Sequence, residues 1–374
     1  MRIDLRVPRL LLACALAAAC SDAPASPPFD DDTDFARFDE VLRDAVRDLG
    51  LEGAAAVVVH RERGIVHVQG YGAFHEDRVF LVASASKPLS AGVLLRLADR
   101  GLLDIDAPIG TYVGDAWGAA KAELTVAQLI SNSAGIPGLL DRPTYQPYRC
   151  QYSPDGSLAD CARQVYQADD TAERIPPDER FRYGGAQWQL AGGIAEAVSG
   201  RSWNELVHET YVATCGAHSL GYTNQFGNDT RFRYPSWFDG DTTTLPHTAN
   251  PNIEGGAHIT VEDYGRILLM HLRGGSCGDS VALSADAVDR MQHDRIAEVY
   301  GGTTPNGQLQ GYGLGWWIDR YADGLVASPG LYGAIPWIDT ERGYGAFIAI
   351  EASARERERI WSAARPVLDM MFER

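Results

Sequence analysis

The spacing of hydrophobic residues predicts a helix and then a β-hairpin at the start of the folded chain. Across residues 34–49, apolar side chains recur every three or four positions, as on one face of an amphipathic helix. The runs 54–59 and 65–68 are short, apolar and rich in β-branched residues, which is typical of strands. The polar turn at 61–64 separates these two runs, so they predict a hairpin.

The middle of the chain differs in pattern from its two ends. Between about residues 105 and 255, helical patches alternate with long polar loops, whereas strand-like runs follow nearer the C-terminus. The helical patches are 126–131, 186–198 and 203–213, the later helices are 261–272 and 354–372, and the strand-like runs are 312–318, 324–327 and 346–350. Strands near both chain ends predict an α+β sandwich, one antiparallel sheet flanked by helices, formed by residues 34–104 and 255–374. Residues 105–254 would form an inserted, mainly helical domain.

The first residues have the pattern of an export signal. Within residues 1–19, arginines precede an apolar run that is too short to span a bilayer as a mature helix. The run ends in small residues before Cys20, which resembles a bacterial lipoprotein signal, although Ala17 stands where that signal carries Leu. We expect an exported protein, periplasmic or membrane-anchored through a lipid on Cys20, with residues 20–33 as a flexible tether. Ordinary cleavage at a nearby alanine is the alternative.

Charge and composition narrow the class of partner. The formal net charge of −17, without a basic stripe, argues against a nucleic-acid partner. Hydrophobic residues make up 45% of the 374 residues, which is enough to bury a large core. The sequence leaves the oligomeric state open.

Four cysteines lie beyond the export signal and predict two disulfides in an exported chain. Cys150 and Cys161 would close a short loop, and Cys215 would then pair with Cys277. Three connectivities are open, and proximity alone favours this one. Zinc-ligand spacing is missing, so we expect no metal site and no cofactor.

The pair Ser84 and Lys87 is the strongest candidate for chemistry. It follows the strand-like run 79–82 and opens a helix predicted over 89–97. On a helix, residues three apart lie on one face, so the Lys87 amine would lie beside the Ser84 hydroxyl. Backbone N–H groups at the helix N-terminus would stabilise an oxyanion. The pair predicts a serine nucleophile with a lysine proton acceptor; the alternative is an N-cap serine beside a surface lysine.

The scarcity of lysine favours the catalytic interpretation. Lysine occurs only at Lys87 and Lys121, and arginine supplies the rest of the 33 basic residues. Arginine keeps its proton in proteins, whereas a desolvated lysine can lose it. A general base one turn after a nucleophilic serine therefore requires lysine.

A second serine-rich segment, Ser131–Gly135, differs by one substitution from a G-x-S-x-G nucleophile elbow. It follows a helical patch and not a strand, so the strand–turn–helix geometry of an elbow is not expected there. Ser84 remains the better nucleophile.

The segment around Ser84 resembles the first motif of the class C β-lactamases and penicillin-binding-protein-like serine hydrolases, a superfamily that includes D-amino-acid peptidases and family VIII carboxylesterases. The similarity runs over roughly residues 34–370, with the motifs in the expected order. The matching segments are 80–94, 97–106, 124–138, 181–192, 254–263, 312–317 and 328–330. Asn132 stands where that superfamily usually has His.

The resemblance implies roles by position. Ser84 would attack the substrate carbonyl, and Lys87 and Tyr183 would share proton transfer, with Tyr183 as the base. The backbone N–H groups of Ser84 and Leu331 would form the oxyanion hole. The residues implied in substrate binding are Gly185, Ser328, Gly330 and Trp337.

Two departures from the motifs bear on the substrate. Gly185 replaces the Asn of the second motif, and Ser328 replaces the Lys or His of the third. In β-lactamases and D-Ala peptidases those groups hold the substrate amide and carboxylate, and a charge-assisted contact is worth about 1.5–3 kcal/mol. A neutral or apolar ester would lose less, so we expect a carboxylesterase that forms a Ser84 acyl-enzyme.

Two other functions stay open from the sequence. A β-lactamase or D-aminopeptidase would use the same fold and nucleophile on a small-molecule amide. A catalytically weak binding or sensor lipoprotein would retain the site without turnover, as the altered motifs allow.

Overall fold

The computed structural model describes residues 34–138, 145–227, 233–299, 310–320, 322 and 324–373. The predicted signal, the tether and the lipidation site Cys20 lie outside these residues. Ala36–Arg374 form one compact unit. Within the described part, no helix is long and apolar enough to cross a membrane.

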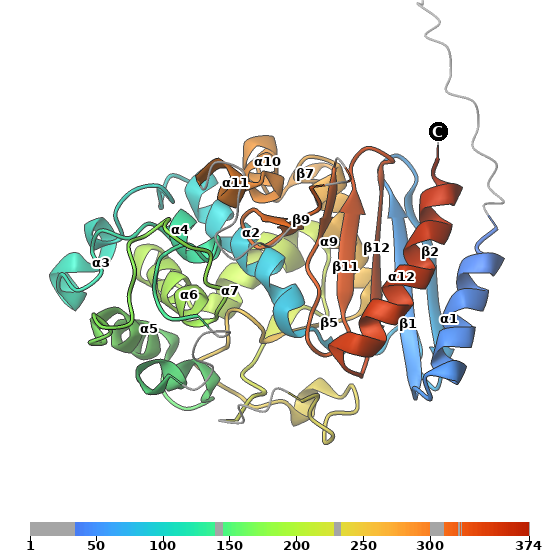
Figure 1. Cartoon of the computed structure of the whole chain (residues 1–374), viewed down its shortest axis with the longest axis horizontal. Helices are drawn as coiled ribbons and strands as arrows, with labels where there is room; N and C mark the ends of the chain where they lie inside the picture. Colours follow the sequence, from blue (N-terminus) through green and yellow to red (C-terminus); the bar gives the residue numbers. More distant parts are fainter. Residues whose placement is uncertain are drawn as a thin grey trace, which may run out of the picture. The chain divides into compact units, whose positions relative to one another are not determined.

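A seven-stranded sheet in the order β2-β1-β12-β11-β10-β9-β8 joins the two ends of the chain (Figure 1). All neighbouring strands are antiparallel, and β1 from the N-terminal half pairs with β12 from the C-terminal end. The strands are β1 (Gly53–His60), β2 (Gly64–Gly72), β8 (Gly311–Tyr312), β9 (Trp317–Ile318), β10 (Leu325–Ala327), β11 (Ile335–Asp339) and β12 (Tyr344–Ile350). The predicted antiparallel sheet, built from both chain ends and flanked by helices, is confirmed.

Helices cover both faces of this sheet. On one face, α1 (Ala36–Asp48) packs against α12 (Ala354–Met371), and on the other α9 (Val261–Leu272) contacts β1 and β12 (Figure 1). Gly265 lets α9 approach closely, because a Cβ there would come within 2.7 Å of Val57. Every residue of β1 is buried, as expected for a strand covered on both faces.

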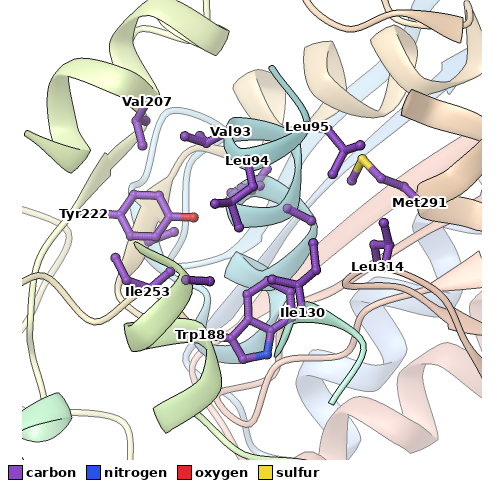
Figure 2. Packing of buried hydrophobic residues seen from close by; sticks show 14 of the residues in the cluster. Val93, Leu94, Leu95, Ile130, Trp188, Val207, Tyr222, Ile253, Met291 and Leu314 are labelled. Atoms are coloured by element: carbon purple, nitrogen blue, oxygen red, sulfur yellow. The ribbon is translucent and has the colours of Figure 1, made fainter. Parts of the chain in front are cut away.

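The helix that follows Ser84 is the most deeply buried one near the site. Helix α2 (Ser86–Asp99) begins three residues before the predicted start and is buried on nearly all sides. Figure 2 shows its Val93, Leu94 and Leu95 among apolar side chains from several other elements. The residues of the first turn, Ser86–Leu89, are buried as well.

The chain segment between β2 and β8, which belong to the large sheet, is mainly helical. It contains α3 (Gly110–Trp117), α4 (Val126–Ile130), α5 (Leu158–Gln167), α6 (Ala186–Ser199) and α7 (Trp203–Val207), which continues through a π-helical turn (His208–Val212) into α8 (Ala213–Cys215). The patches expected to be helical therefore are helical, and α3 and α5 are additional. The limits of an insert domain at 105 and 254 stay a prediction.

Smaller elements complete the structure. A three-stranded sheet in the order β3-β5-β4 contains β3 (Phe80–Leu81), β5 (Ala257–Ile259) and β4 (Gly221–Tyr222). The others are the hairpin β6 (Ser276–Cys277) and β7 (Ser280–Val281), helices α10 (Ala285–Gln292) and α11 (Arg295–Val299), and 3₁₀ turns at Ala83–Ala85, Gln146–Tyr152 and Thr242–Thr244. The run expected at 79–82 thus joins the small sheet and not the large one.

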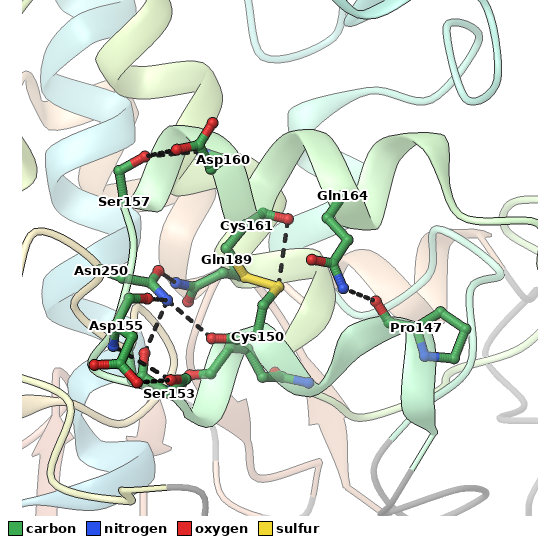
Figure 3. The surroundings of a disulfide bond; sticks show 12 residues. Pro147, Cys150, Ser153, Asp155, Ser157, Asp160, Cys161, Gln164, Gln189 and Asn250 are labelled. Carbon is green, nitrogen blue, oxygen red and sulfur yellow. Dashed lines mark hydrogen bonds between the residues drawn. A yellow bond between two sulfur atoms is a disulfide. The ribbon is translucent and has the colours of Figure 1, made fainter.

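Both disulfides have the predicted connectivity. Cys150 pairs with Cys161 across 5.5 Å between Cα atoms, and Cys215 pairs with Cys277 across 5.0 Å. Around the first disulfide, the Asn250 side-chain amide donates to the Cys150 carbonyl at 2.8 Å (Figure 3). The disulfide ties the 3₁₀ turn at Gln146–Tyr152 to α5, and Gln164 of α5 also donates to the Pro147 carbonyl at 3.1 Å.

Candidate active site

Ser84 lies on a tight turn between β3 and α2. The residue before it, Ala83, has φ +45°, a left-handed conformation that is unfavourable for alanine and common at functional sites. Hydrogen bonds hold the turn in place: the Ser86 hydroxyl donates to the Ala83 carbonyl at 2.6 Å, and the Tyr264 hydroxyl donates to the Ala85 carbonyl at 2.7 Å. Ser84 itself is half-buried, whereas its neighbours Ala83 and Ala85 are buried.

Lys87 lies beside Ser84, as the spacing predicted. Its Nζ donates to Ser84 Oγ at 3.2 Å and lies 4.5 Å from the centre of the Tyr183 ring. The lysine is fully buried, so it is not a surface residue. The structure therefore brings the three predicted catalytic residues together.

A fourth residue, Glu254, joins this group and was not predicted to take part in it. Its Oε2 lies 3.0 Å from Lys87 Nζ, and the side chains of Lys87 and Glu254 are 0% and 6% exposed. The sequence offered one signal for it, since Glu254 precedes two glycines in a segment that resembles the superfamily. That segment alone does not reveal a contact across 167 positions of sequence.

The Glu254 carboxylate changes the protonation expected for Lys87. Burial by itself lowers the pKa of Lys87, but Glu254 and Tyr183 oppose burial, and the resulting pKa lies above the ordinary value for lysine. The contacts with Glu254 and Tyr183 thus favour the ammonium form of Lys87. Its role as the proton acceptor of Ser84 stays a prediction.

Tyr183 is held in place by Asn132, the residue that replaces the usual His. The Asn132 Oδ1 accepts hydrogen bonds from Gly184 N at 3.2 Å, Gln187 Nε2 at 3.1 Å and Trp188 Nε1 at 3.3 Å. Asn132 has φ +57°, which asparagine tolerates better than most residues. On its other side, the Tyr183 ring stacks on Trp317 at 5.6 Å between ring centres.

We expect Asn132→Ala to reduce both stability and activity. Loss of Oδ1 leaves buried donors unpaired, which should lower the free energy of unfolding by about 2–4 kcal/mol. A displaced Tyr183 should lower kcat by about ten- to a hundred-fold. Asn204→Ala is the control, because it removes hydrogen bonds to the Tyr222 backbone and should not lower kcat. Thermal melts and ester kinetics measure both effects, and an unchanged kcat in Asn132→Ala would contradict the role given to Asn132.

The space beside Gly185 explains the departure in the second motif. Gly185 stands directly before α6, and a Cβ added to it would overlap the carboxylate of Glu254 and the side-chain amide of Gln151. The volume that an asparagine side chain would need is therefore occupied by Glu254. A substrate-binding role for Gly185 stays a prediction.

The third motif runs alongside the Ser84 turn. The Ser328 hydroxyl donates to the Ser84 carbonyl at 3.3 Å, and a Cβ on Gly330 would overlap the Val82 carbonyl. Leu331 follows in a turn and is 41% exposed. These contacts place Ser328 and Gly330 against the turn that carries Ser84. The oxyanion hole formed by the N–H groups of Ser84 and Leu331 stays a prediction.

Trp337 lies away from this group of residues. It is fully buried on β11, and its indole N–H donates to the Tyr344 hydroxyl at 3.1 Å. Tyr344 in turn donates to Asp369 of α12 at 2.6 Å. Trp337 therefore packs toward α12, on one of the two sides that alternate residues of a strand face. The expectation that it contacts substrate stays a prediction.

The alternative serines belong to a structural network. Ser133 donates to Asp178 at 2.6 Å, and Arg295 donates to both Ser131 and Ser133 at 2.9 and 2.7 Å. Both serines are buried, so neither is presented to a substrate. Among the described residues, no group of His, Cys, Asp and Glu side chains is arranged to hold a metal ion.

Comparisons with known proteins show the family to which this chain belongs. The family profile described as Beta-lactamase matches residues 38–367. Penicillin-binding protein 4 of Amycolatopsis lactamdurans is 25% identical over 285 residues, which cover 71% of this chain and 67% of that protein. Esterase EstB of Burkholderia gladioli is 25% identical over 223 residues, and the match spans about half of each protein, 55%.

Solved structures share the fold. EstCE1, described as a hydrolase with promiscuous acyltransferase activity, matches with a TM-score of 0.69 at 17% identity, over 89% of this chain and 99% of that one. A penicillin-binding protein homologue from Pyrococcus abyssi matches with a TM-score of 0.68 at 19% identity, over 90% of this chain and 77% of that one.

Proposed function

Since this chain belongs to the β-lactamase family of serine hydrolases, we propose that it is a carboxylesterase that acts on neutral or apolar esters. Ser84 would form the acyl-enzyme, and water would release the acid. The observation that carries the proposal is the buried ion pair between Lys87 and Glu254 beside the nucleophile.

The ion pair supports a neutral substrate for an electrostatic reason. Glu254 offsets the charge of Lys87 at 3.0 Å, so this pair offers little net attraction to a substrate carboxylate. Ser328, in place of a lysine or histidine, adds no cation. An ester without a charge would lose nothing by these changes.

A pocket with partly aromatic walls supports an apolar group on the ester. It has a volume of about 620 Å³, and its lining includes Phe226, Tyr234, Trp237 and Tyr332 together with the polar side chains of Gln225 and Arg233. Phe226 and Tyr332 pack in one cluster with Ala83, the neighbour of Ser84. Aromatic walls favour an apolar acyl or alkoxy group.

One observation favours the second candidate, a β-lactamase or D-aminopeptidase. Arg357 of α12 donates to the Gly330 carbonyl at 2.9 Å, next to the third motif. A guanidinium there would attract a substrate carboxylate. We rank this function second for two reasons. Arg357 already donates to the Gly330 carbonyl, and the negative charge of Glu254 in the same site would repel a substrate carboxylate.

A substrate panel tests the proposal. We expect kcat/KM for p-nitrophenyl esters to exceed that for nitrocefin and for D-Ala-containing peptides by about ten- to a hundred-fold, the value of a lost charge-assisted contact. Butyrate should exceed acetate by about tenfold, because two more methylenes are buried. Faster turnover of nitrocefin or D-Ala peptides would establish the second candidate instead. Labelling of Ser84 by a fluorophosphonate without turnover of any substrate would indicate a binding protein.

We also propose that the protein is exported. Two disulfides support an oxidising compartment, since such bonds are rare in the cytosol. Mass spectrometry of the membrane fraction of expressing cells, with and without Cys20→Ala, tests whether a lipid anchors the chain.

A further inference from the structure

Glu254 has the position of a proton acceptor and not only that of a counter-ion. We propose that the Glu254 carboxylate receives the proton of Ser84 through Lys87 during acylation. The inference rests on the proposed hydrolase function, since it concerns the same nucleophile. It adds Glu254 to the catalytic residues that the resemblance implies, which are Ser84, Lys87 and Tyr183.

The distances form a continuous path for a proton. Ser84 Oγ lies 3.2 Å from Lys87 Nζ, and Lys87 Nζ lies 3.0 Å from Glu254 Oε2. Lys87 also donates to the Glu254 carbonyl at 3.3 Å, which aligns the ammonium between its two partners. Because all three atoms of the path are within hydrogen-bonding distance of the next, no water is needed.

The absence of a side chain at Gly185 leaves room for the Glu254 carboxylate beside Lys87. Glu254 fills volume that a side chain at position 185 would need, so the glycine and the glutamate act together. A buried carboxylate is costly unless it is paired, and Glu254 is 6% exposed. Its cost is offset by Lys87, which must itself carry a charge for the pair to form.

The other titratable groups around Glu254 are poor acceptors. Tyr152, from the 3₁₀ turn, donates to Glu254 Oε1 at 3.4 Å, and burial together with Glu254 holds the pKa of Tyr152 well above its usual value. Burial, Tyr183 and Glu254 likewise raise the pKa of Tyr312. Both phenols stay protonated at neutral pH. The Tyr183 ring centre lies 4.5 Å from Lys87 Nζ, whereas Glu254 Oε2 lies 3.0 Å from it.

The step balances in atoms and electrons. Ser84 Oγ bonds to the ester carbonyl carbon as the carbonyl π pair moves to oxygen. The Ser84 proton passes to Lys87 Nζ while Lys87 passes one of its own protons to Glu254 Oε2. When the oxyanion collapses, the bond to the leaving alcohol breaks, and the proton returns from Glu254 through Lys87 to the departing alkoxide oxygen. Lys87 begins and ends each step as an ammonium.

The test compares the rate at which a fluorophosphonate–biotin probe labels Ser84 in Glu254→Gln and in the parent protein, from pH 6 to pH 10, by intact-protein mass spectrometry. The probe reports nucleophile activation whatever the natural substrate. We expect labelling at pH 7 to fall by about a hundred- to a thousand-fold. The remaining rate should rise toward pH 10, because removal of the carboxylate lowers the pKa of Lys87 and frees it as a base.

A simple counter-ion role predicts the opposite result. If Glu254 only keeps Lys87 charged, Glu254→Gln leaves more neutral Lys87 at pH 7, and labelling stays equal or becomes faster. That result would overturn the proposal. Rapid hydrolysis of nitrocefin by the parent protein would instead overturn the esterase assignment and leave the labelling comparison valid.

The chain offers a matched control in its second buried pair, Lys121 and Asp170. Lys121 Nζ lies 3.1 Å from Asp170 Oδ2, and the two side chains are 0% and 2% exposed. Asp170→Asn removes the buried carboxylate beside Lys121, which is not in contact with Ser84. The variant should label at a rate within about twofold of the parent protein.

A second experiment uses the parent protein alone, in case Glu254→Gln does not fold. It measures the rate of Ser84 labelling in H₂O–D₂O mixtures. If two protons move in the same step, the labelling rate falls along a curve as the fraction of deuterium rises. A linear decrease would indicate a single proton and would overturn the relay.

Discussion

Ser84→Ala should lower kcat/KM for p-nitrophenyl butyrate by about 10⁴-fold or more, because it removes the atom that bonds to the substrate. The fold should tolerate the change. Ser84 is half-buried, and the bonds from Ser86 and Tyr264 that hold its turn do not involve its hydroxyl. The thermal midpoint should therefore remain close to that of the parent protein.

Intact-protein mass spectrometry provides the control for this variant. The parent protein should gain one fluorophosphonate adduct, and Ser84→Ala should gain none. Ester hydrolysis by Ser84→Ala at the parent rate would show that another residue is the nucleophile. The buried serines Ser131 and Ser133 would then need to be tested, although Arg295 and Asp178 already bind them.

Lys87→Met should reduce activity by about a thousand-fold and also destabilise the protein. The substitution breaks the proton path and leaves Glu254 as a buried charge without its partner. Loss of one member of a buried pair costs about 3–5 kcal/mol of unfolding free energy. Urea unfolding and ester kinetics measure the two effects separately.

Lys121→Met distinguishes catalysis from stability, because Lys121 is the other buried lysine. It also has a carboxylate partner, and it donates to the carbonyls of Tyr166 and Ala168 at 3.1 and 3.0 Å. We expect Lys121→Met to lose about as much stability as Lys87→Met, about 3–5 kcal/mol, while the folded fraction keeps the parent kcat. Equal loss of kcat in both variants would mean that Lys87 acts only through stability.

The second lysine also qualifies an argument from the sequence. Scarcity of lysine suggested that Lys87 is retained for proton transfer, yet Lys121 is retained at a buried structural pair. Lysine in this chain therefore marks buried ion pairs in general. What distinguishes Lys87 from Lys121 is its distance of 3.2 Å from the Ser84 hydroxyl.

The elements missed from the sequence have local causes. Strand β11 contains Pro336, which usually argues against a central strand because proline has no N–H to donate. Its carbonyl still accepts from Ser328 N at 3.1 Å, and this bond brings the third motif alongside β11. The irregular turn at Ala83 also has no sequence signal, since alanine seldom adopts a positive φ.

The sequence by itself predicted the strands near both chain ends and the contact of Ser84 with Lys87. These features depend on periodicity or on neighbours within one helical turn, which a single sequence records directly. Proximity only favoured one of three disulfide connectivities, and the tertiary structure decided between them. Only the tertiary structure decided that Glu254 lies against Lys87, that it fills the space beside Gly185, and that Trp337 faces α12. Those contacts join residues far apart in sequence, or depend on which side of a strand a residue faces. The contacts of Glu254 and Trp337 are therefore decided by close packing of the whole interior and not by a local sequence pattern.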